Sequence, residues 1–348
     1  MTGSQDFMTL ALQLAERGRF TVSPNPMVGC VIVKNNQIVG QGFHVSAGLT
    51  HAEINALENA GPAAQNANMY VTLEPCCHYG RTPPCVSAII NAGISKVYIA
   101  CLDPNPKVAG QGIAALKAAG IEVHVGLCED EAKKLNKIFF HYITHQRPYI
   151  IAKWAMSLDG KTITHPVDSR DISCPASRSR THETRHAVDA ILVGANTAIH
   201  DNPLLTVRTN EPSNVKHPIR IVLSSHGKLP ANLKMFAEDM PAKTIIATTD
   251  EYDTATIISN NVEFIRTKKN MQGKVDLAHL LDELGAREIT SLLVEGGMTV
   301  HESFFNEDLI NEYQVYIAPV IIGSMQNKKL LTNLQMQPID RDYFLIGS

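Results

Sequence analysis

The chain has 348 residues, of which 44% are hydrophobic and 19% are charged, and its formal net charge at pH 7 is −3. This length favours about two domains with ample hydrophobic core. The nearly balanced charge offers no basic surface for nucleic acid, which argues against an enzyme that edits DNA or RNA and predicts no nucleic-acid partner.

The cysteines and the hydrophobic runs of the sequence indicate where in the cell the protein is expected. Seven cysteines, an odd number, occur in a chain whose first six residues are polar, so we predict no secretory leader. Reduced thiols and a cytoplasmic location are expected. No apolar run approaches the roughly 18 residues that a transmembrane helix needs, so we predict no membrane association.

The first part of the chain alternates helical and strand patterns. A helix with one apolar face is expected between Ser4, a candidate N-cap, and Gly18. A proline-containing loop then leads into a hairpin with strands at 30–33 and 38–42. Further helices are expected at 52–60, 86–92, 112–119 and 131–145, with strands at 69–73, 96–101 and 121–125. This alternation predicts a sheet with helices on both faces.

Two short segments carry residue types that bind zinc. His51-Ala52-Glu53 opens one predicted helix, and Cys76 and Cys85 flank a loop that leads into another. A catalytic zinc site has three protein ligands and a fourth position for water. We therefore predict His51, Cys76 and Cys85 as zinc ligands, with Glu53 as the group that shuttles protons. His-x-Glu followed by Pro-Cys and a further Cys is the pattern of zinc nucleobase deaminases.

The cysteine spacing leaves alternatives open. The usual pattern is Pro-Cys-x-x-Cys, whereas eight residues separate Cys76 from Cys85. Pro84 suits a first helical turn, which would place Cys85 at a helix start whose dipole favours a thiolate. Cys77 is the alternative ligand, and we prefer Cys76 because it directly follows a proline. Buried cysteines beside unrelated histidines, or a structural zinc, are the competing interpretations.

Two polar residues near the hairpin are weaker candidates. Asn25 lies between two prolines that fix the backbone, which would present its amide rigidly to a ligand, but a plain turn residue is an equal alternative. His44 follows the second strand, where a single histidine is more often structural than functional.

We place a domain boundary after Gln146, which gives domains 1–146 and 147–348. Trp154, the only tryptophan, lies in a strand at 149–156 that we expect outside the first sheet. Further strands are expected at 190–194, 219–223, 243–248, 262–265, 291–295 and 313–320, with a helix at 277–284. Glu295-Gly296-Gly297 joins a strand to a predicted helix, where glycines let backbone N–H groups approach a phosphate or simply serve a turn.

With both parts considered, the chain resembles the bifunctional riboflavin-biosynthesis deaminase/reductase family. In the first part the matching motifs are Pro24-Asn25-Pro26-x-Val28-Gly29, His51-Ala52-Glu53 and Glu74-Pro75-Cys76-x-His78-x-Gly80-Arg81-Thr82-Pro83-Pro84-Cys85, with the family's long cysteine spacing. In the second they are Lys153-x-Ala155-x-Ser157-Leu158-Asp159-Gly160, Asp201-Asn202-Pro203-x-Leu205-Thr206-x-Arg208 and Glu295-Gly296-Gly297.

The resemblance implies an α/β protein with an N-terminal cytidine-deaminase-like three-layer α/β/α domain and a C-terminal domain like dihydrofolate reductase. It implies Zn²⁺ and NADPH as cofactors. The implied substrate is a small molecule, a diaminopyrimidinone ribotide that is deaminated and then reduced at its ribose to a ribityl chain. A homo-oligomer, either a dimer or a tetramer, is the expected assembly.

The resemblance also implies residue roles by position. The deaminase substrate would be bound by Asn25, His44, His78 and Arg81. NADPH would be bound by Ala155, Asp171, Thr197, Asp201, Ser224 and Gly297. The reductase substrate would be bound by Lys153, Ser169, Arg185, Leu205, Arg208 and Glu295, where guanidinium groups suit phosphate oxygens.

Two of these roles have a specific weakness. A solvated helix face is the alternative for Arg185, which lies in a charge-rich helical stretch. Asp171 is a departure, because the family usually has tryptophan just before the position of Ile172.

Two other functions compete with the bifunctional enzyme. A zinc-stabilised nucleotide-binding protein without catalysis would not need Glu53. A deaminase of tRNA or DNA would need the basic surface that the composition lacks.

Overall fold

The computed structural model describes residues 3–77, 83–106, 108–162, 172–208, 215–226, 229–249 and 259–323, together with strands 329–330, 335–339 and 342–346. The chain divides into one compact unit of Met1–Tyr149 with Leu281–Thr290 and a second of Ile150–Leu280 with Ser291–Ser348. The boundary after residue 146 stays a prediction. Within the described ranges, no helix combines the length and apolar character needed to cross a bilayer.

The first unit is built on a five-stranded sheet in the order β2-β1-β3-β4-β5. Its strands are β1 (Gly29–Lys34), β2 (Gln37–Phe43), β3 (Asn68–Leu73), β4 (Lys96–Cys101) and β5 (Glu122–Val125). Strand β1 runs antiparallel to β2 and β3, whereas β3, β4 and β5 are parallel. Its helices are α1 (Ser4–Glu16), α2 (Ala52–Ala60), η1 (Gly61–Ala64), α3 (Cys85–Asn91), α4 (Gln111–Ala118), α5 (Glu129–Leu135) and α6 (Lys137–His145).

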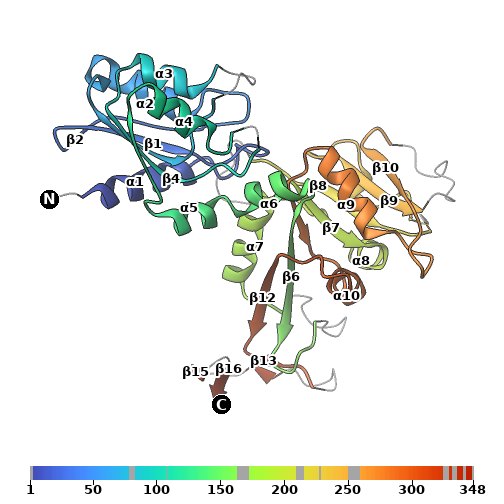
Figure 1. Cartoon of the computed structure of the whole chain (residues 1–348). Coiled ribbons are helices and arrows are strands. Elements are labelled where there is room, and N and C mark those ends of the chain that lie inside the picture. Colours follow the sequence, from blue (N-terminus) through green and yellow to red (C-terminus); the bar gives the residue numbers. More distant parts are fainter. Residues whose placement is uncertain are drawn as a thin grey trace. The chain divides into compact units, whose positions relative to one another are not determined.

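Helices cover both faces of this sheet, as predicted (Figure 1). Neighbouring residues of a strand point to opposite faces, so Ile32 packs in the core with Ala56 of α2, and Val31 packs in the other core with Met8 of α1. Helices α3 and α4 share the side of α2, and α5 shares the side of α1. The fold is the mixed α/β arrangement expected for a cytidine-deaminase-like domain.

Glycines let α2 lie directly on β2. A Cβ atom built on Gly42 would come within 2.6 Å of the Ala52 carbonyl oxygen, and one on Gly40 within 2.4 Å of the Ala56 carbonyl oxygen. Any larger residue in these positions would push the helix away from the sheet. The contact at Ala52 fixes the first turn of α2, where His51 and Glu53 lie.

Two local predictions are wrong. The helix expected at 131–145 is broken at Asn136, whose side-chain amide donates to the Met27 carbonyl and accepts the Met27 N–H, both at 2.8 Å. This pairing holds Asn136 out of helical geometry. Ser4 is not the N-cap of α1, because Gly3 has that position and the Asp6 carboxylate accepts the Gly3 N–H at 2.8 Å.

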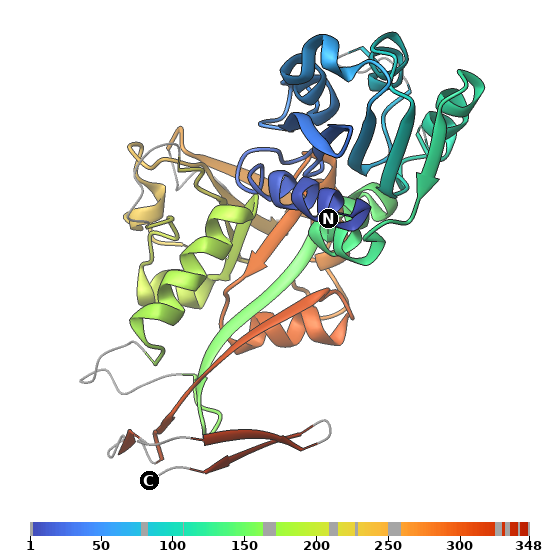
Figure 2. The same cartoon turned by 90° about the vertical axis from the view of Figure 1, so that its left-hand side faces the viewer.

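The second unit contains a seven-stranded sheet in the order β10-β9-β8-β7-β11-β6-β12. Strands β6 and β12 lie side by side as the long green and dark orange arrows of Figure 2. Its strands are β6 (Tyr149–Ser157), β7 (Ala190–Gly194), β8 (Ile219–Leu223), β9 (Thr244–Thr249), β10 (Val262–Thr267), β11 (Ser291–Val294) and β12 (Glu312–Ala318). The pairings β10–β9–β8–β7–β11 and β6–β12 are parallel. The helices are α7 (Pro175–Ala187), α8 (Ala195–Asp201), η2 (Lys234–Phe236), α9 (Leu277–Ala286) and α10 (Met298–Asn306). Short strands β13 (Val320–Ile321) and β14 (Lys329–Leu330) pair with each other, as do β15 (Gln335–Ile339) and β16 (Asp342–Ile346).

Adjacent residues of β6 show that α7 and α10 cover opposite faces of the sheet. The Trp154 ring lies 5.4 Å from the His301 ring of α10, measured between centroids. Lys153 points the other way, toward Glu295, which is paired with Arg185 of α7. Trp154 therefore belongs to the second sheet, as predicted, and the α7 side of that sheet carries the charged residues.

Candidate active sites

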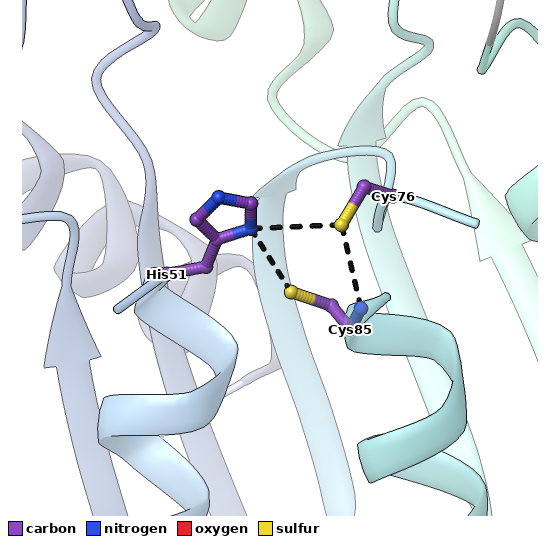
Figure 3. A group of neighbouring side chains, drawn as sticks. All are labelled: His51, Cys76 and Cys85. Atoms are coloured by element: carbon purple, nitrogen blue, oxygen red, sulfur yellow. Dashed lines mark hydrogen bonds between the residues drawn. The ribbon is translucent and has the colours of Figure 1, made fainter. Parts of the chain in front are cut away.

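In the first unit, three predicted ligand side chains meet at one point (Figure 3). The Nδ1 atom of His51 lies 3.1 Å from Sγ of Cys85 and 3.5 Å from Sγ of Cys76. The ligand atoms of the three residues all lie within 4.8 Å of one another. Sequence separations of 25 and 34 residues are thus closed by the fold.

Two helix starts and one strand end produce this cluster. His51 is the N-cap of α2, and Cys85 is the first residue of α3, directly after Pro84. Cys76 follows β3, and its carbonyl accepts the N–H of Val86 at 3.2 Å. Because backbone N–H groups at helix starts favour negative charge, the start of α3 favours a thiolate at Cys76, whose Sγ accepts the Cys85 N–H.

The two cysteines differ in their preference for the thiolate. Hydrogen bonding from the Cys85 thiol, assisted by His51 and by the Cys85 backbone N–H at 3.3 Å, holds the pKa of Cys76 far below its usual range. The same contact with Cys76, together with burial, raises the pKa of Cys85. The cluster therefore favours the thiolate form at Cys76, which is the form that binds a metal cation.

The donor set fits zinc. One imidazole nitrogen and two sulfurs are ligands that zinc prefers, and bonds of about 2.3 Å to sulfur and about 2.0 Å to nitrogen imply ligand atoms roughly 3.5 Å apart. The two N···S distances in the cluster are 3.1 and 3.5 Å. Cys77 is directed elsewhere, with its Sγ 4.0 Å from Oε1 of Gln111.

Glu53 lies beside this cluster in a cavity of about 310 Å³. It occupies the first turn of α2 and is only 4% exposed. Burial, and then the negative charge of Cys76, raise the pKa of its carboxyl group. A carboxyl group with a raised pKa, next to a cavity, is suited to accept and return a proton.

Asn25 and His44 form a polar pair on the wall of the same cavity. His44 Nδ1 lies 3.1 Å from the Thr50 carbonyl oxygen, which can only accept, so Nδ1 carries the hydrogen in the neutral ring. Nε2 then accepts a hydrogen bond from the Asn25 side-chain amide at 3.0 Å. Burial lowers the pKa of His44, which keeps the ring neutral. His44 is thus a buried residue of the cavity wall.

The polar residues of the cavity wall that the sequence analysis missed include Asp103 and Asn105. Their loop is held by the buried carboxylate of Glu74, which accepts N–H groups of Gly110 at 3.0 Å and Ile113 at 3.2 Å. The available signal was Asp103-Pro104-Asn105-Pro106, which begins two residues after the end of a predicted strand. The predicted residues His78 and Arg81 lie outside the described residues.

In the second unit, a carboxylate and two cations form the centre of the predicted reductase site. Glu295 accepts paired hydrogen bonds from Arg185, at 2.7 Å from Nε and 3.0 Å from Nη2, and Lys153 Nζ lies 3.6 Å away. Burial acts to raise the pKa of Glu295, but the charge and hydrogen bonds of Arg185, with Lys153, outweigh it and lower the pKa. Arg185 is only 13% exposed, so the solvated-face alternative is wrong.

Several predicted cofactor residues lie at the carboxyl ends of parallel strands, where open α/β sheets bind ligands. Thr197 is in α8 after β7, Ser224 is buried directly after β8, and Gly297 follows β11. The Gly297 N–H donates to Oγ1 of Thr197 at 3.2 Å, so residues 100 positions apart are in contact. Asp201 ends α8 and is exposed.

Of the remaining predicted residues, three lie in described parts of the chain and two do not. Ala155 lies two residues beyond Lys153 in β6 and therefore on the same face of the sheet. Leu205 is buried with a left-handed backbone (φ 53°), and Arg208 is exposed. Ser169 and Asp171 lie outside the described residues.

Family models match both parts of the chain. One described as the RibD C-terminal domain matches residues 148–341. Another, described as the cytidine and deoxycytidylate deaminase zinc-binding region, matches residues 1–101.

Relatives match along nearly the whole length. The riboflavin biosynthesis protein RibD of Actinobacillus pleuropneumoniae is 42% identical over 97% of this chain and 89% of its own. RibD of Escherichia coli (strain K12) is 41% identical over 91% and 88%. Among solved structures, Acinetobacter baumannii RibD (form 1) has a TM-score of 0.83 at 38% identity, covering 99% of this chain and 98% of its own. A diaminohydroxyphosphoribosylaminopyrimidine deaminase/5-amino-6-(5-phosphoribosylamino)uracil reductase from Thermotoga maritima has a TM-score of 0.81 at 34% identity, covering 99% and 97%.

Proposed function

The chain belongs to the RibD family of riboflavin biosynthesis proteins, and from this premise we propose that it catalyses two successive steps on one pyrimidine ribotide. The first is hydrolytic deamination of 2,5-diamino-6-(5-phosphoribosylamino)pyrimidin-4-one. The second is NADPH-dependent reduction of the ribose of 5-amino-6-(5-phosphoribosylamino)uracil to a ribityl chain. The protein is thus a zinc-dependent deaminase joined to an NADPH-dependent reductase.

In the deaminase site, His51, Cys76 and Cys85 would hold the zinc ion. Zinc, when bound, supplies a Lewis acid that makes water nucleophilic near neutral pH. Glu53 takes a proton from the attacking water and returns it to the amino group that leaves as ammonia. Asn25 and His44 orient the pyrimidine from the cavity wall, with His78 and Arg81 kept as predicted contacts to the ribotide.

In the reductase site, Thr197, Gly297, Ala155, Asp201, Ser224 and Asp171 would hold NADPH, which supplies the hydride when bound. Lys153, Arg185, Glu295, Leu205, Arg208 and Ser169 would bind the ribotide. The Arg185–Glu295 pair fixes the carboxylate, and Lys153 places a cation beside it. Arg208 is exposed and offers paired donors to a phosphate.

The observation that carries the deaminase proposal is the position of Glu53. A carboxyl group 4% exposed, with a raised pKa, beside an N,S,S cluster and a cavity is costly unless it serves chemistry. A zinc-stabilised binding protein would gain nothing from it. A tRNA or DNA deaminase is disfavoured by the net charge of −3.

The proposal extends to assembly and location. We expect a homo-oligomer, a dimer or a tetramer, that binds no nucleic acid. A cytoplasmic location agrees with the cysteines, because all seven lie in described residues and none forms a disulfide, the state that a reducing compartment preserves.

The direct test is incubation of the purified protein with the diaminopyrimidinone ribotide, with and without NADPH, followed by mass spectrometry. Without NADPH, one mass change is expected, for replacement of an amino group by oxygen. With NADPH, a second change is expected, for the addition of two hydrogen atoms. An unchanged ribotide would reject the deaminase, and an absent second change would reject the reductase.

A further inference from the structure

The segment Leu205–Arg208 carries Arg208 but has no regular secondary structure. Side chains, in place of other backbone groups, form hydrogen bonds with its backbone N–H and C=O groups. Arg185 Nη1 donates to the Thr206 carbonyl at 3.2 Å. His217 Nδ1 lies 3.2 Å from the Val207 nitrogen and accepts its N–H, and His182 Nδ1 accepts the Arg208 N–H at 3.2 Å.

The segment also begins in a strained conformation. Leu205 has a left-handed backbone (φ 53°), which costs free energy for a residue with a side chain, and it is buried at 5% exposure. Such a residue persists only where its surroundings determine the conformation. The three side-chain hydrogen bonds that follow Leu205 provide those surroundings.

The Nδ1 atom of both histidines must carry no hydrogen, because a hydrogen on Nδ1 would point at the hydrogen of the backbone N–H group that Nδ1 accepts. Their environment favours this state. Burial, then the charges of Arg185 and Arg208, lower the pKa of His182 to about 4. Burial, then Arg220, lower the pKa of His217. Each ring is therefore neutral near pH 7, with its hydrogen on Nε2.

We propose that His182 and His217 are positioning residues of the reductase, which hold through Nδ1 the backbone that presents Arg208 to the ribotide. This inference rests on the proposed contact between Arg208 and the substrate. His182 acts on the residue itself, since its partner is the Arg208 N–H. His217 acts one residue earlier, at Val207.

The geometry offers a matched pair of substitutions. In His182→Asn the side-chain oxygen takes the position of Nδ1 and still accepts a hydrogen bond. In His182→Gln the amide group reaches the position of Nε2 and leaves the Arg208 N–H without its acceptor. A role through Nδ1 therefore predicts that asparagine restores function and glutamine does not.

The experiment is steady-state reduction of 5-amino-6-(5-phosphoribosylamino)uracil by the full chain, with NADPH and ribotide varied separately. His182→Leu and His182→Gln should raise the KM for the ribotide roughly threefold to tenfold, the loss expected for one hydrogen bond. The KM for NADPH and the deaminase activity should not change. The KM of His182→Asn should be close to that of the unsubstituted protein. Likewise, His217→Leu should raise the KM for the ribotide, and His217→Asn should leave it close to normal.

A double variant tests whether His182 acts through Arg208. If it does, adding His182→Leu to Arg208→Ala should raise the ribotide KM no further. Additive effects would overturn the inference, and so would rescue by glutamine in place of asparagine. A lowered thermal transition of Trp154 fluorescence in every variant, with KM unrescued by asparagine, would make His182 a merely structural residue.

Two results separate the failure of this inference from that of the proposed function. An unchanged ribotide KM in Arg208→Ala would reject the substrate role of Arg208 and this inference with it. A raised KM in Arg208→Ala beside an unchanged KM in His182→Leu would reject the inference alone.

Discussion

The two sites differ in how the chain builds them. His51 and Glu53 of the deaminase site are two residues apart, and Cys76 and Cys85 lie on either side of one loop. The proposed reductase site collects Lys153 from β6, Arg185 from α7, Arg208 from an irregular segment and Glu295 from the position after β11. Metal ligands are restricted to a few residue types, so a zinc site is visible from residue type and spacing, whereas a site made of common charged residues could be named from the sequence only through the family resemblance.

The two sites also differ in what fixes their backbone. His51 and Cys85 begin helices, whose own hydrogen bonds hold the ligands in place. Arg208 lies on an irregular segment that depends on side chains from α7 and from the residues before β8. We therefore expect deamination to be impaired mainly by substitutions of the site residues themselves. Reduction should also be impaired by substitutions of neighbouring residues that do not contact the substrate.

The largest effect is expected at the metal cluster. Cys85→Ser removes one of three ligands, so zinc content per chain should fall sharply and deamination should be lost, while reduction of the pre-deaminated ribotide continues. Zinc is measured by elemental analysis of the purified protein. Cys77→Ser is the matched control and should retain zinc, because Cys77 points toward Gln111. Equal zinc in the wild type and Cys85→Ser would show that the ligands are misassigned.

The second effect separates catalysis from metal binding at the same site. Glu53→Gln keeps the shape of the side chain but removes its ability to shuttle protons, so deamination should fall about 10²- to 10⁴-fold. Zinc content and ribotide reduction should remain as in the wild type. A loss below roughly tenfold would be too small for a general acid–base group.

The sequence predicted the elements and residues that depend on local pattern. Most strands and helices and the trio His51, Cys76 and Cys85 follow from periodicity, helix starts and residue type, whereas strands β14 and β15 were not predicted. The break at Asn136 could not be predicted, because its cause is a pair of hydrogen bonds to Met27, 109 residues away.

The residues that were missed share one physical feature, because their roles depend on backbone groups distant in sequence. His182 lies in α7 and its partner, the Arg208 N–H, is 26 residues away. Asp103 and Asn105 matter because their loop lines the cavity, and the loop is held by Glu74, which is 36 residues before Gly110. Nothing in the local pattern of a histidine or an asparagine indicates such a partner.

The third prediction tests the reductase side of the comparison. Arg208→Ala removes a charge-assisted contact worth on the order of 1.5 to 3 kcal/mol, so affinity for the ribotide should fall roughly 10- to 100-fold. Calorimetric titration measures the ribotide and NADPH separately, and NADPH affinity should hardly change. Arg180→Ala is the matched control, because Arg180 is an exposed arginine of α7 paired with Glu183. Weakened NADPH with normal ribotide binding would reverse the assignment of Arg208.

The smallest effect is a pH dependence of stability in the second unit. Burial is the main cause that lowers the pKa values of four of its histidines, His182, His186, His217 and His301. In the unfolded chain these groups titrate near about 6.5, so as pH falls below that value the unfolded state binds protons that the folded state does not. The stabilisation is complete above the unfolded pKa and is lost as pH falls toward the folded pKa, which is about 4 for His182.

Trp154 makes this effect measurable in the full chain, because it is the only tryptophan and lies in β6. The thermal transition of its fluorescence should move to lower temperature between pH 7.5 and pH 5.5, by a few degrees. His182→Asn should reduce the shift, since asparagine keeps the acceptor for the Arg208 N–H but does not titrate. A transition with the same midpoint at both pH values would mean that the folded unit takes up protons as readily as the unfolded chain. In that case the folded second unit would not keep its four histidines in the neutral form.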